Sequence, residues 1–448
     1  MNIKLLKQNL FNQSEELQMK YTLWMNHLLV VYAFLLPISN HAKAQIQFVI
    51  LGLFFIRSNF KKYLSESIQN PVVIAFILYF SMYILWLIGT ENFNYASKLI
   101  DQNKYAVFFP ILIFSFFDKR MTTKVISGFL IGVLFSEIFS YMISLNIIPW
   151  KYTFLEKELY QAFAINDPSP FLHHTKYGLV LAIGVTFLIH NLLTQSYTII
   201  EKLIAIFFIL SITINMSITG GRVGYLTYII LAFTLLILYF RKRILKPLLA
   251  MIIFFIIIAS TAYNYSSLFK ERINYTINTI EKLNNNHLDF STSFGARLGM
   301  WYYSSDVIKN NFLFGVGTGD HIDAIKQNIK INNAHYEVIK HPHNQFISIL
   351  LQFGIIGLII FLNIFYQTFI YNYISNYNRN IAFLTTISII ISFLIEGDLV
   401  KFYLPFWILF ISISITNKEY SSIPNINNFS ILKYILITAV SMILAFFI

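Results

Sequence analysis

The chain contains no cysteine, and only 12% of its 448 residues are charged. The absence of cysteine excludes disulfides, thiol nucleophiles and cysteine-ligated metals. The low charge excludes a soluble globular protein, because about 25% of the residues of such a protein are charged. Hydrophobic residues make up 56% of the chain, and its mean hydropathy is +0.62. A chain of this composition cannot cover a globule with polar surface, so it belongs in a lipid bilayer.

Several motifs of soluble enzymes are also missing. The turn GVGTG at 315–319 lacks the Lys-Ser/Thr pair of a phosphate-binding P-loop, and there is no Gly-x-Ser-x-Gly motif. His321, His335, His341 and His343 lack the accompanying carboxylate spacing of a zinc site. We therefore expect neither a bound metal nor a cofactor. A polar stretch of about twenty residues precedes the first apolar run, so we expect no cleavable signal peptide.

Apolar runs, by contrast, are abundant. About thirteen of them are long enough, or nearly so, to cross a bilayer as helices, and long alternating strand patterns are absent. The sequence therefore predicts an all-α polytopic membrane bundle with twelve to thirteen transmembrane helices. The apolar cores are at 22–39, 45–57, 71–89, 104–117, 125–147, 176–194, 198–217, 222–240, 246–264, 344–370, 381–396, 401–416 and 430–448.

Clusters of lysine and arginine indicate the orientation of this bundle. They lie at 57–62, 118–124 and 241–246, after the second, fourth and eighth runs, whereas the loops between these runs on the opposite side carry few basic residues. The positive-inside rule therefore predicts a cytoplasmic N-terminus. Topology explains the net charge of +12 first, and affinity for anionic lipid or phosphate second, so we expect membrane lipids and no nucleic acid as partners.

Two outward gaps between the runs are long, at about 148–175 and 265–343. The second is large enough for a small folded subdomain, in which we expect amphipathic helices, including 293–310, and then a turn at 314–320. The predicted parts of the chain are N-terminal transmembrane helices at 1–264, a loop subdomain at 265–343 and C-terminal transmembrane helices at 344–448.

The most unusual polar residues stand at the entrance to the run at 344–370. His343 and Asn344 precede a glycine pair, Gly354 and Gly357, and Pro342 makes the entrance rigid. On a helix the two glycines share one face and allow a neighbouring helix to approach closely. The residues alone leave two interpretations open: a histidine at a functional site, or an interfacial histidine beside a helix-packing glycine pair.

A second candidate is Arg222, at the junction of the seventh and eighth runs and on the same outward side as His343. Gly220, Gly221 and Gly224 leave the backbone bare around it, which suits the close approach of a ligand. The alternative is an arginine that snorkels to the interface. Snorkelling does not require glycines, so the pattern favours a functional arginine.

Further candidates come from the two outward gaps. Arg297 and Trp301 are four residues apart, so they share one helix face, either as a surface cation–π pair or as an arginine directed at a phosphate beside an aromatic ring. His173, His174 and Lys176 enter the sixth run from outside and are candidates to line a site.

Two carboxylates, Glu396 and Asp398, lie near the outer end of the eleventh run. Carboxylates at membrane depth are costly and often functional, but at an interface solvation explains them, and we favour solvation. Secondary transporters carry broken helices and charges at the membrane midplane. Here the unusual polar groups lie at the outer mouth instead.

The spacing of His343-Asn344, nine residues and then Gly354-x-x-Gly357 resembles the signature of the O-antigen ligase and polymerase superfamily. Members of this superfamily are bacterial inner-membrane glycosyltransferases with about a dozen helices. A long periplasmic loop precedes their signature helix, as the segment 265–343 does here. The resemblance implies a site that faces the periplasm.

The order of the arginines extends the resemblance over about residues 180–420. An arginine at the start of a helix, in a context of small residues, matches Arg222. An arginine followed four residues later by tryptophan, and then by GVG, matches Arg297, Trp301 and 315–317. The resemblance implies that Arg222 and Arg297 bind the pyrophosphate of a lipid-linked donor. It also implies that His343 is the general base, with Asn344 orienting it or the substrate.

The implied reaction is the transfer of a glycan from undecaprenyl pyrophosphate to an acceptor hydroxyl, inverting and independent of metal. In the leading hypothesis the acceptor is lipid A-core, and the protein is a ligase of lipopolysaccharide biosynthesis. A polymerase that extends a growing lipid-linked glycan uses the same chemistry, and an oligosaccharyltransferase acting on protein is a further variant. A lipid or polysaccharide transporter without catalysis is the alternative from another class. Trp301, His174 and Lys176 are expected to support the site.

Overall fold

The structure is a computed structural model and describes residues 14–154, 157–164, 166–284, 293–331, 342–396 and 402–419. Within these ranges the chain is helical except for one antiparallel hairpin in the first outward gap. The hairpin pairs β1 (Lys151–Phe154) with β2 (Lys157–Gln161), and Lys151 lies opposite Gln161.

The first half of the described chain forms helices on both sides of several sharp turns. They are α2 (Glu15–Leu35), α3 (Asn40–Ile56), α4 (Phe60–Ser67), α5 (Pro71–Leu85), α6 (Phe93–Asn103), α7 (Tyr105–Phe116), the 3₁₀ turn η1 (Lys119–Met121) and α8 (Thr122–Ser144).

The second half begins with four long helices and later returns to the membrane after the loop subdomain. Its helices are α9 (His174–Thr194), α10 (Ile199–Ile218), α11 (Arg222–Phe240), α12 (Leu245–Tyr265), α13 (Ser267–Asn284), α14 (Ser293–Asn310), α15 (His321–Ile331), α16 (Gln345–Ile370), α17 (Asn376–Ile395) and α18 (Tyr403–Ile415).

The protein is a polytopic helical membrane protein, as the sequence predicts. Among the described residues, seven helices are long and apolar enough to span a bilayer: Lys119–Ser144, α9, α10, α11, α12, α16 and α17. The pair α4 and α5, bent by 88°, adds an eighth if it is one broken span. Each of the first twelve apolar runs contains a helix, but α3, α7 and α18 are short and α2 is more polar. The thirteenth run, 430–448, lies outside the described residues.

Local sequence signals explain where the helices start. The side chain of Asn70 accepts hydrogen bonds from the first turn of α5, and Pro71 occupies the first helical position. Thr198 and Glu201 form a reciprocal capping box at the start of α10. The helix predicted at 293–310 is observed as α14 with the same bounds, but its apolar and polar residues are not segregated to opposite faces, so its predicted amphipathic character is wrong.

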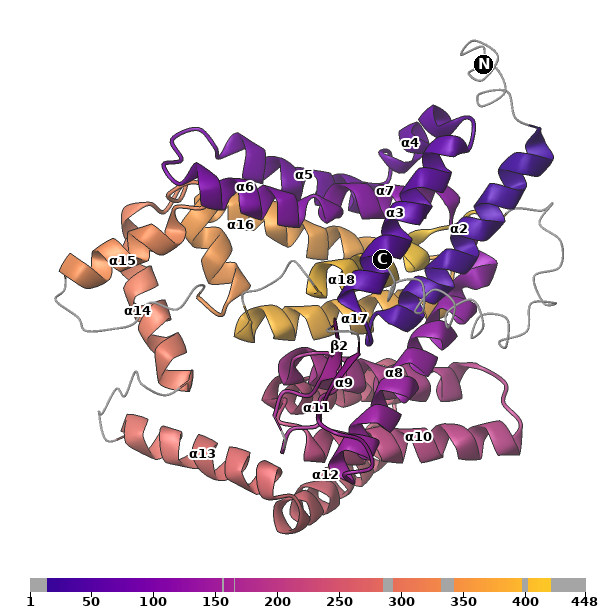
Figure 1. The fold of residues 1–448 in the computed structure, drawn as a ribbon, viewed down its shortest axis with the longest axis vertical. Coiled ribbons are helices and arrows are strands. Elements are labelled where there is room, and N and C mark those ends of the chain that lie inside the picture. Colours follow the sequence, from indigo (N-terminus) through magenta and orange to yellow (C-terminus); the bar gives the residue numbers. More distant parts are fainter. Residues whose placement is uncertain are drawn as a thin grey trace.

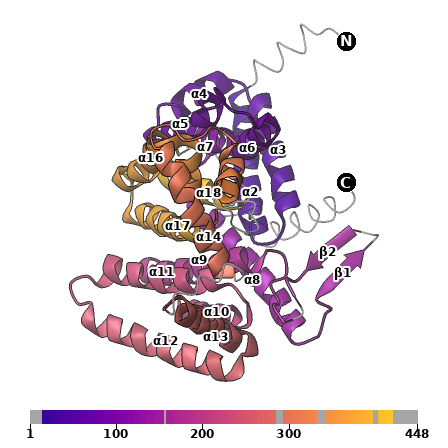
Figure 2. The ribbon, with the colours of Figure 1, turned by 90° about the vertical axis from the view of Figure 1, so that its left-hand side faces the viewer.

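The helices form two groups that are joined by α17 and by α8, which packs on α2 and also on α9 and α10 (Figures 1 and 2). In the upper group α16 packs on α5, and α18 packs on α7 and α17. In the lower group α9 packs on α10 and α11, and both α9 and α11 contact α17. The helices α13, α14 and α15 of the loop subdomain gather at the left of Figure 1, beside one end of the spanning helices. They therefore cover only that end of the bundle.

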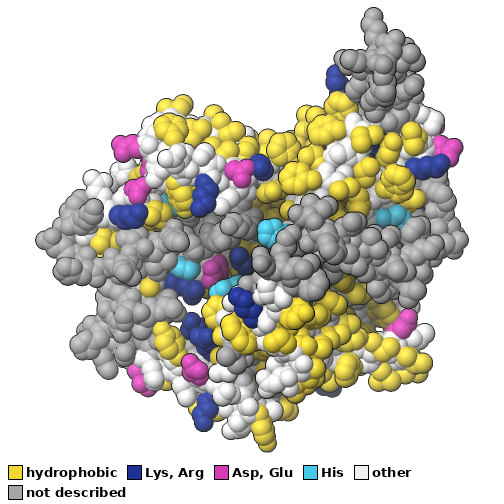
Figure 3. All heavy atoms as spheres, in the orientation of Figure 1, with side chains coloured by type: hydrophobic (Ala, Val, Ile, Leu, Met, Phe, Trp, Pro, Cys, Tyr) yellow, Lys and Arg dark blue, Asp and Glu magenta, His cyan; other side chains and the backbone are white. Residues whose placement is uncertain are grey.

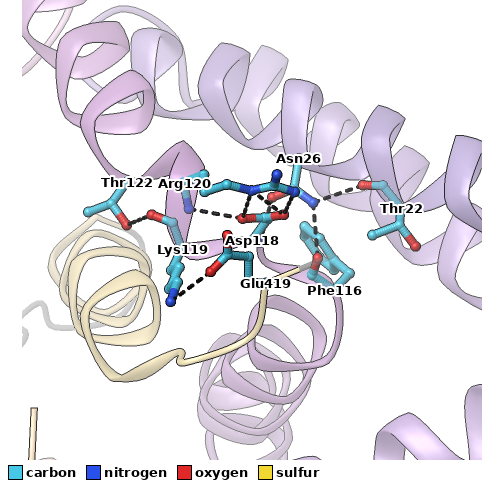
Figure 4. Close-up of polar contacts among 8 residues, drawn as sticks. All are labelled: Thr22, Asn26, Phe116, Asp118, Lys119, Arg120, Thr122 and Glu419. Carbon is cyan, nitrogen blue, oxygen red and sulfur yellow. Dashed lines mark hydrogen bonds and ion pairs between the residues drawn. The ribbon is translucent and has the colours of Figure 1, made fainter. Parts of the chain in front are cut away.

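A polar network fixes the turn between α7 and α8, at the other end of the spanning helices (Figure 4). Asn26 of α2 accepts a hydrogen bond from the backbone N–H of Asp118 at 2.9 Å. The Asp118 carboxylate is buried and pairs with Arg120 at 2.6 Å, and Lys119 pairs with Glu419 at 2.8 Å. These contacts connect α2, the α7–α8 turn and the segment after α18.

Candidate functional site

The candidate residues meet at one end of the spanning helices. There α9, α11 and α16 begin, while α10, α12 and α17 end. Figure 3 shows basic, acidic and histidine side chains gathered in a hollow between the two groups of helices. The loop subdomain borders the same end, so residues far apart in the sequence face one another here.

His343 is held in a constrained backbone conformation just before α16. Its φ of 51° lies in the left-handed region, which is uncommon for a residue with a side chain. On one side, Trp301 Nε1 donates a hydrogen bond to the carbonyl of Pro342 at 2.9 Å. On the other, Asn344 caps α16 by accepting from Ile347 N–H, and its amide also donates to the carbonyl of Leu394 at 3.3 Å. Trp301 and Asn344 thus position the histidine backbone.

Glu396 joins the histidine to one of the candidate arginines. Its Oε1 lies 3.3 Å from Arg297 Nη2, and its Oε2 lies 3.7 Å from His343 Nδ1. Only 15% of the Glu396 side chain is exposed, so the solvated interpretation favoured from the sequence is wrong. The other carboxylate, Asp398, lies outside the described residues. Arg297 on α14, His343 before α16 and Glu396 at the end of α17 therefore form one ionic group.

Arg222 is the first residue of α11, and the glycines around it have a different use from the one expected. A Cβ at Gly224 would lie 2.6 Å from Cα of Gly178, and one at Gly221 would lie 2.4 Å from the carbonyl oxygen of His174. These two glycines therefore let α11 approach α9, and they do not expose the backbone to a ligand. The Arg222 guanidinium lies over the Tyr275 ring, 5.5 Å from its centroid.

A third arginine, Arg272 on α13, stands beside the two that the sequence indicates. Arg222 interacts electrostatically with both Arg272 and Arg297, so three like charges are brought together. The buried Nε atoms of Arg272 and Arg297 have no hydrogen-bond partner among the described residues. Such a group of cations favours a multiply charged anion. Sequence reasoning missed Arg272 because α13 carries no motif, and only the fold brings it to Arg222.

His174 forms a second histidine–carboxylate pair, with Asp167. His174 Nδ1 lies 3.0 Å from Asp167 Oδ2, and Ser169 donates to the other carboxylate oxygen at 2.7 Å. Burial by itself raises the pKa of Asp167, but the hydrogen bonds from His174 and Ser169 outweigh it and lower this pKa. Asp167 is therefore ionised at neutral pH. Lys176, in the first turn of α9, interacts electrostatically with His173.

The glycine pair of α16 also differs from the expectation. Gly354 breaks the helix, with φ of 63° and ψ of −161°, so the two glycines do not share one face of a continuous helix. A Cβ at Gly354 would lie 2.3 Å from the carbonyl oxygen of Leu313, whereas one at Gly357 would meet Phe353 of its own helix at 2.0 Å. Gly354 therefore allows the turn after α14 to dock against the break.

The part of the chain that the structure describes contains no cluster of metal-binding side chains. No group of three or more histidine, aspartate or glutamate side chains there is placed to hold a metal ion. His335 and His341 lie outside the described residues, so the expected contrast between His341 and His343 stays a prediction.

Comparison with known proteins points to one family. Residues 205–362 match the family model described as O-Antigen ligase. The matched stretch runs from α10 into α16 and contains Arg222, Arg272, Arg297 and His343. A search of the curated proteins found no match.

Proposed function

Because residues 205–362 carry an O-antigen ligase family domain, we propose that the protein is a membrane glycosyltransferase that moves a glycan from a lipid-linked donor to an acceptor hydroxyl. The convergence of Arg222, Arg297 and His343 at one end of the spanning helices is the observation that supports this function best. The proposed donor is a glycan linked through pyrophosphate to undecaprenol.

The arginines supply what a pyrophosphate needs. A guanidinium stays charged and binds phosphate oxygens through two parallel hydrogen bonds. Arg272 and Arg297 both repel Arg222, and a pyrophosphate bound between these arginines relieves that repulsion. Arg297 already pairs with a carboxylate, Glu396, which occupies part of the position that a phosphate would take. As the glycosidic bond breaks, these cations stabilise the charge that develops on the leaving group.

His343 supplies the proton acceptor in this proposal. The acceptor hydroxyl oxygen attacks the anomeric carbon of the donor sugar from the face opposite the pyrophosphate. The bond from that carbon to the pyrophosphate oxygen breaks, and undecaprenyl pyrophosphate leaves with the electron pair. The hydroxyl proton passes to His343 Nε2, because Nδ1 faces Glu396. The carboxylate of Glu396 stabilises the imidazolium that forms. No metal takes part in this scheme.

The acceptor decides between two closely related activities. We propose a ligase that uses lipid A-core as the acceptor, and a polymerase that extends another undecaprenyl-linked glycan is the alternative. The basic clusters at 57–62, 118–124 and 241–246 support a site on the periplasmic side of a bacterial inner membrane. A transporter is disfavoured because the charged groups gather at the ends of the helices.

A transfer assay tests the proposal directly. The purified full-length protein, in detergent or nanodiscs, is given a defined undecaprenyl pyrophosphate glycan and either lipid A-core or a second lipid-linked glycan. We expect undecaprenyl pyrophosphate to be released and a longer product to form with one acceptor, in the presence of a chelator. Loss of product in the Arg222→Ala variant is the control. Absence of transfer to both acceptors would contradict the proposed function.

A further inference from the structure

The pair of His174 and Asp167 is not used by the mechanism above, although it lies next to the arginines. The carboxylate of Asp167 is only 3% exposed and lies 3.0 Å from His174 Nδ1. The hydrogen bond from Ser169 and one from the backbone N–H of Gly220 further fix this carboxylate. The imidazole is therefore held in one orientation by a buried ionised group.

Gly220 brings this pair next to Arg272. A Cβ at Gly220 would lie 2.5 Å from Asp167 Oδ2, 3.2 Å from Arg272 Nη2 and 3.4 Å from its Nε. A side chain at 220 would clash with the carboxylate and press on the guanidinium, so only the bare Gly220 backbone leaves space for the two groups side by side. Arg272 Nε is buried without a hydrogen-bond partner among the described residues. Arg222 follows two residues later, so this space adjoins the phosphate-binding arginines.

The chemistry of these groups identifies a ligand class. When the imidazole of His174 is uncharged and donates from Nδ1 to the ionised Asp167, its Nε2 carries a lone pair. That lone pair accepts a hydrogen bond from a hydroxyl group, whereas a fully ionised phosphate has no proton to donate. The guanidinium of Arg272, in contrast, is suited to a phosphate oxygen. The two groups together match a hydroxyl that lies beside a phosphate.

We propose that Asp167, His174 and Arg272 form a sugar-binding subsite that receives a saccharide hydroxyl next to a phosphate group. His174 accepts the hydrogen bond from the hydroxyl, Asp167 orients His174, and Arg272 binds the adjacent phosphate. The subsite extends the proposed function, because a glycan bound through pyrophosphate presents this combination. The sugar is either the first one of the donor or a phosphorylated one of the acceptor.

Ligand binding tests the subsite without any transfer reaction. Glucose 1-phosphate and methyl phosphate carry the same charge, but only the first has sugar hydroxyls. We expect the wild-type protein in detergent to bind glucose 1-phosphate roughly tenfold more tightly by calorimetry, the difference that one or two hydrogen bonds confer. His174→Gln should remove this preference and leave the affinity for methyl phosphate unchanged. Asp167→Asn should also remove the preference, because His174 loses the group that orients it. Arg272→Gln should weaken the binding of both ligands.

A double variant and a control separate recognition from stability. Asp167→Asn combined with His174→Gln should lose no more affinity than either single change, because the two side chains act as one unit. Asp101→Asn, at an exposed carboxylate that pairs with Lys104, should bind both ligands as the wild type does. Equal affinity of the folded wild-type protein for the two ligands would overturn the subsite. A selective wild-type protein that transfers no glycan would instead contradict the proposed function alone.

Transfer kinetics then identify the source of the sugar. If it belongs to the donor, His174→Gln should raise the donor KM about tenfold and leave the acceptor KM unchanged. If it belongs to the acceptor, the effect should be on the acceptor KM. A lower melting temperature with both KM values unchanged would show that the pair only stabilises the fold, and it would overturn the proposal.

Discussion

Three arginines, Arg222, Arg272 and Arg297, bring like charges together at the edge of the membrane-spanning part of the protein. The carboxylate of Glu396 pairs with Arg297 and lies 3.7 Å from His343 Nδ1. Like charges held together in a partly buried position are costly unless an anion compensates them. At the scale of single residues, the site is therefore prepared for a negatively charged ligand.

Alanine and lysine variants of the arginines should distinguish the contribution of the positive charge to the transfer rate from that of the planar guanidinium group. We expect Arg222→Ala and Arg297→Ala to reduce transfer by at least about 100-fold, because stabilisation of the leaving group is lost. The lysine variants should recover only part of this rate, since an ammonium group lacks the planar fork. Initial rates of undecaprenyl pyrophosphate release give the comparison. Near-normal turnover of Arg297→Ala would remove that residue from the site.

Replacement of His343 should affect the rate more than donor binding. General-base catalysis contributes typically about 10²–10⁴-fold, so His343→Ala should lose a factor in this range. Donor binding should survive because the arginines remain. His341→Ala should have a much milder effect. Equal losses for the two histidines, measured in one transfer assay, would contradict the general-base role.

Glu396 should behave as a positioning residue for His343. Glu396→Gln should lower kcat by roughly 10–100-fold, the usual effect of removing an outer partner of a functional histidine. The donor KM should fall at the same time, because Arg297 loses the carboxylate that competes with phosphate. Steady-state kinetics with the donor varied can resolve the two effects. A rise in the donor KM would show that Glu396 serves only to hold Arg297 in place.

At the scale of helices, close backbone contacts decide how the site is assembled. Gly221 and Gly224 let α11 lie against α9, which brings Arg222 next to His174. The turn after α14 docks against the break of α16 at Gly354. This contact holds α14, the helix that carries Arg297, beside α16. Both arrangements depend on the absence of a Cβ, so changes at these glycines should act through stability before they act on chemistry.

Gly354→Ala provides a test at this scale. An added Cβ would lie 2.3 Å from the carbonyl oxygen of Leu313, at a φ of 63°. Such strain costs on the order of 1–3 kcal/mol, before the steric clash is counted. We expect a clearly lower melting temperature in detergent. Gly52→Ala is the matched control, because nothing lies within 4 Å of its Cβ and alanine favours a helix, and its melting temperature should not fall. Equal melting temperatures for wild type and Gly354→Ala would contradict the close docking of this turn.

At the scale of the whole molecule, two groups of helices are joined by α17 and α8, and the loop subdomain lies at one end of them (Figure 1). In the proposed reaction the lipid of the donor stays in the bilayer while its head group reaches the arginines, because the candidate site is at the ends of the spanning helices. This arrangement requires that 265–343 and 241–246 lie on opposite sides of the membrane.

Cysteine labelling tests this topology, since the chain contains no cysteine of its own. Ser293→Cys should react with an impermeant maleimide from the periplasmic side, and Lys242→Cys should react only from the cytoplasmic side. Intact cells or spheroplasts, compared with inside-out vesicles, provide the two directions. Labelling of Ser293→Cys from the cytoplasmic side alone would overturn the periplasmic location of the site.

The class of fold and most of the helices could be predicted from the amino-acid sequence. Composition and apolar runs predict a polytopic helical bundle because the length of a spanning helix is set by the thickness of the bilayer. The order of Arg222, Arg297 and His343 also follows from local signals and from a family resemblance. These features depend on residues that are close in the chain.

Which side chains meet, in contrast, depends on how the helices pack. Arg272 and Asp167 carry no local signal, and Glu396 looks like a solvated carboxylate in the sequence. Each has a partner from another segment of the chain. Arg272 interacts electrostatically with Arg222, and Asp167 is hydrogen-bonded to His174. Glu396 contacts both Arg297 and His343. The use of the glycines likewise depends on which backbone faces them. Such contacts follow from how helices pack across long sequence separations, which no pattern within a single segment encodes.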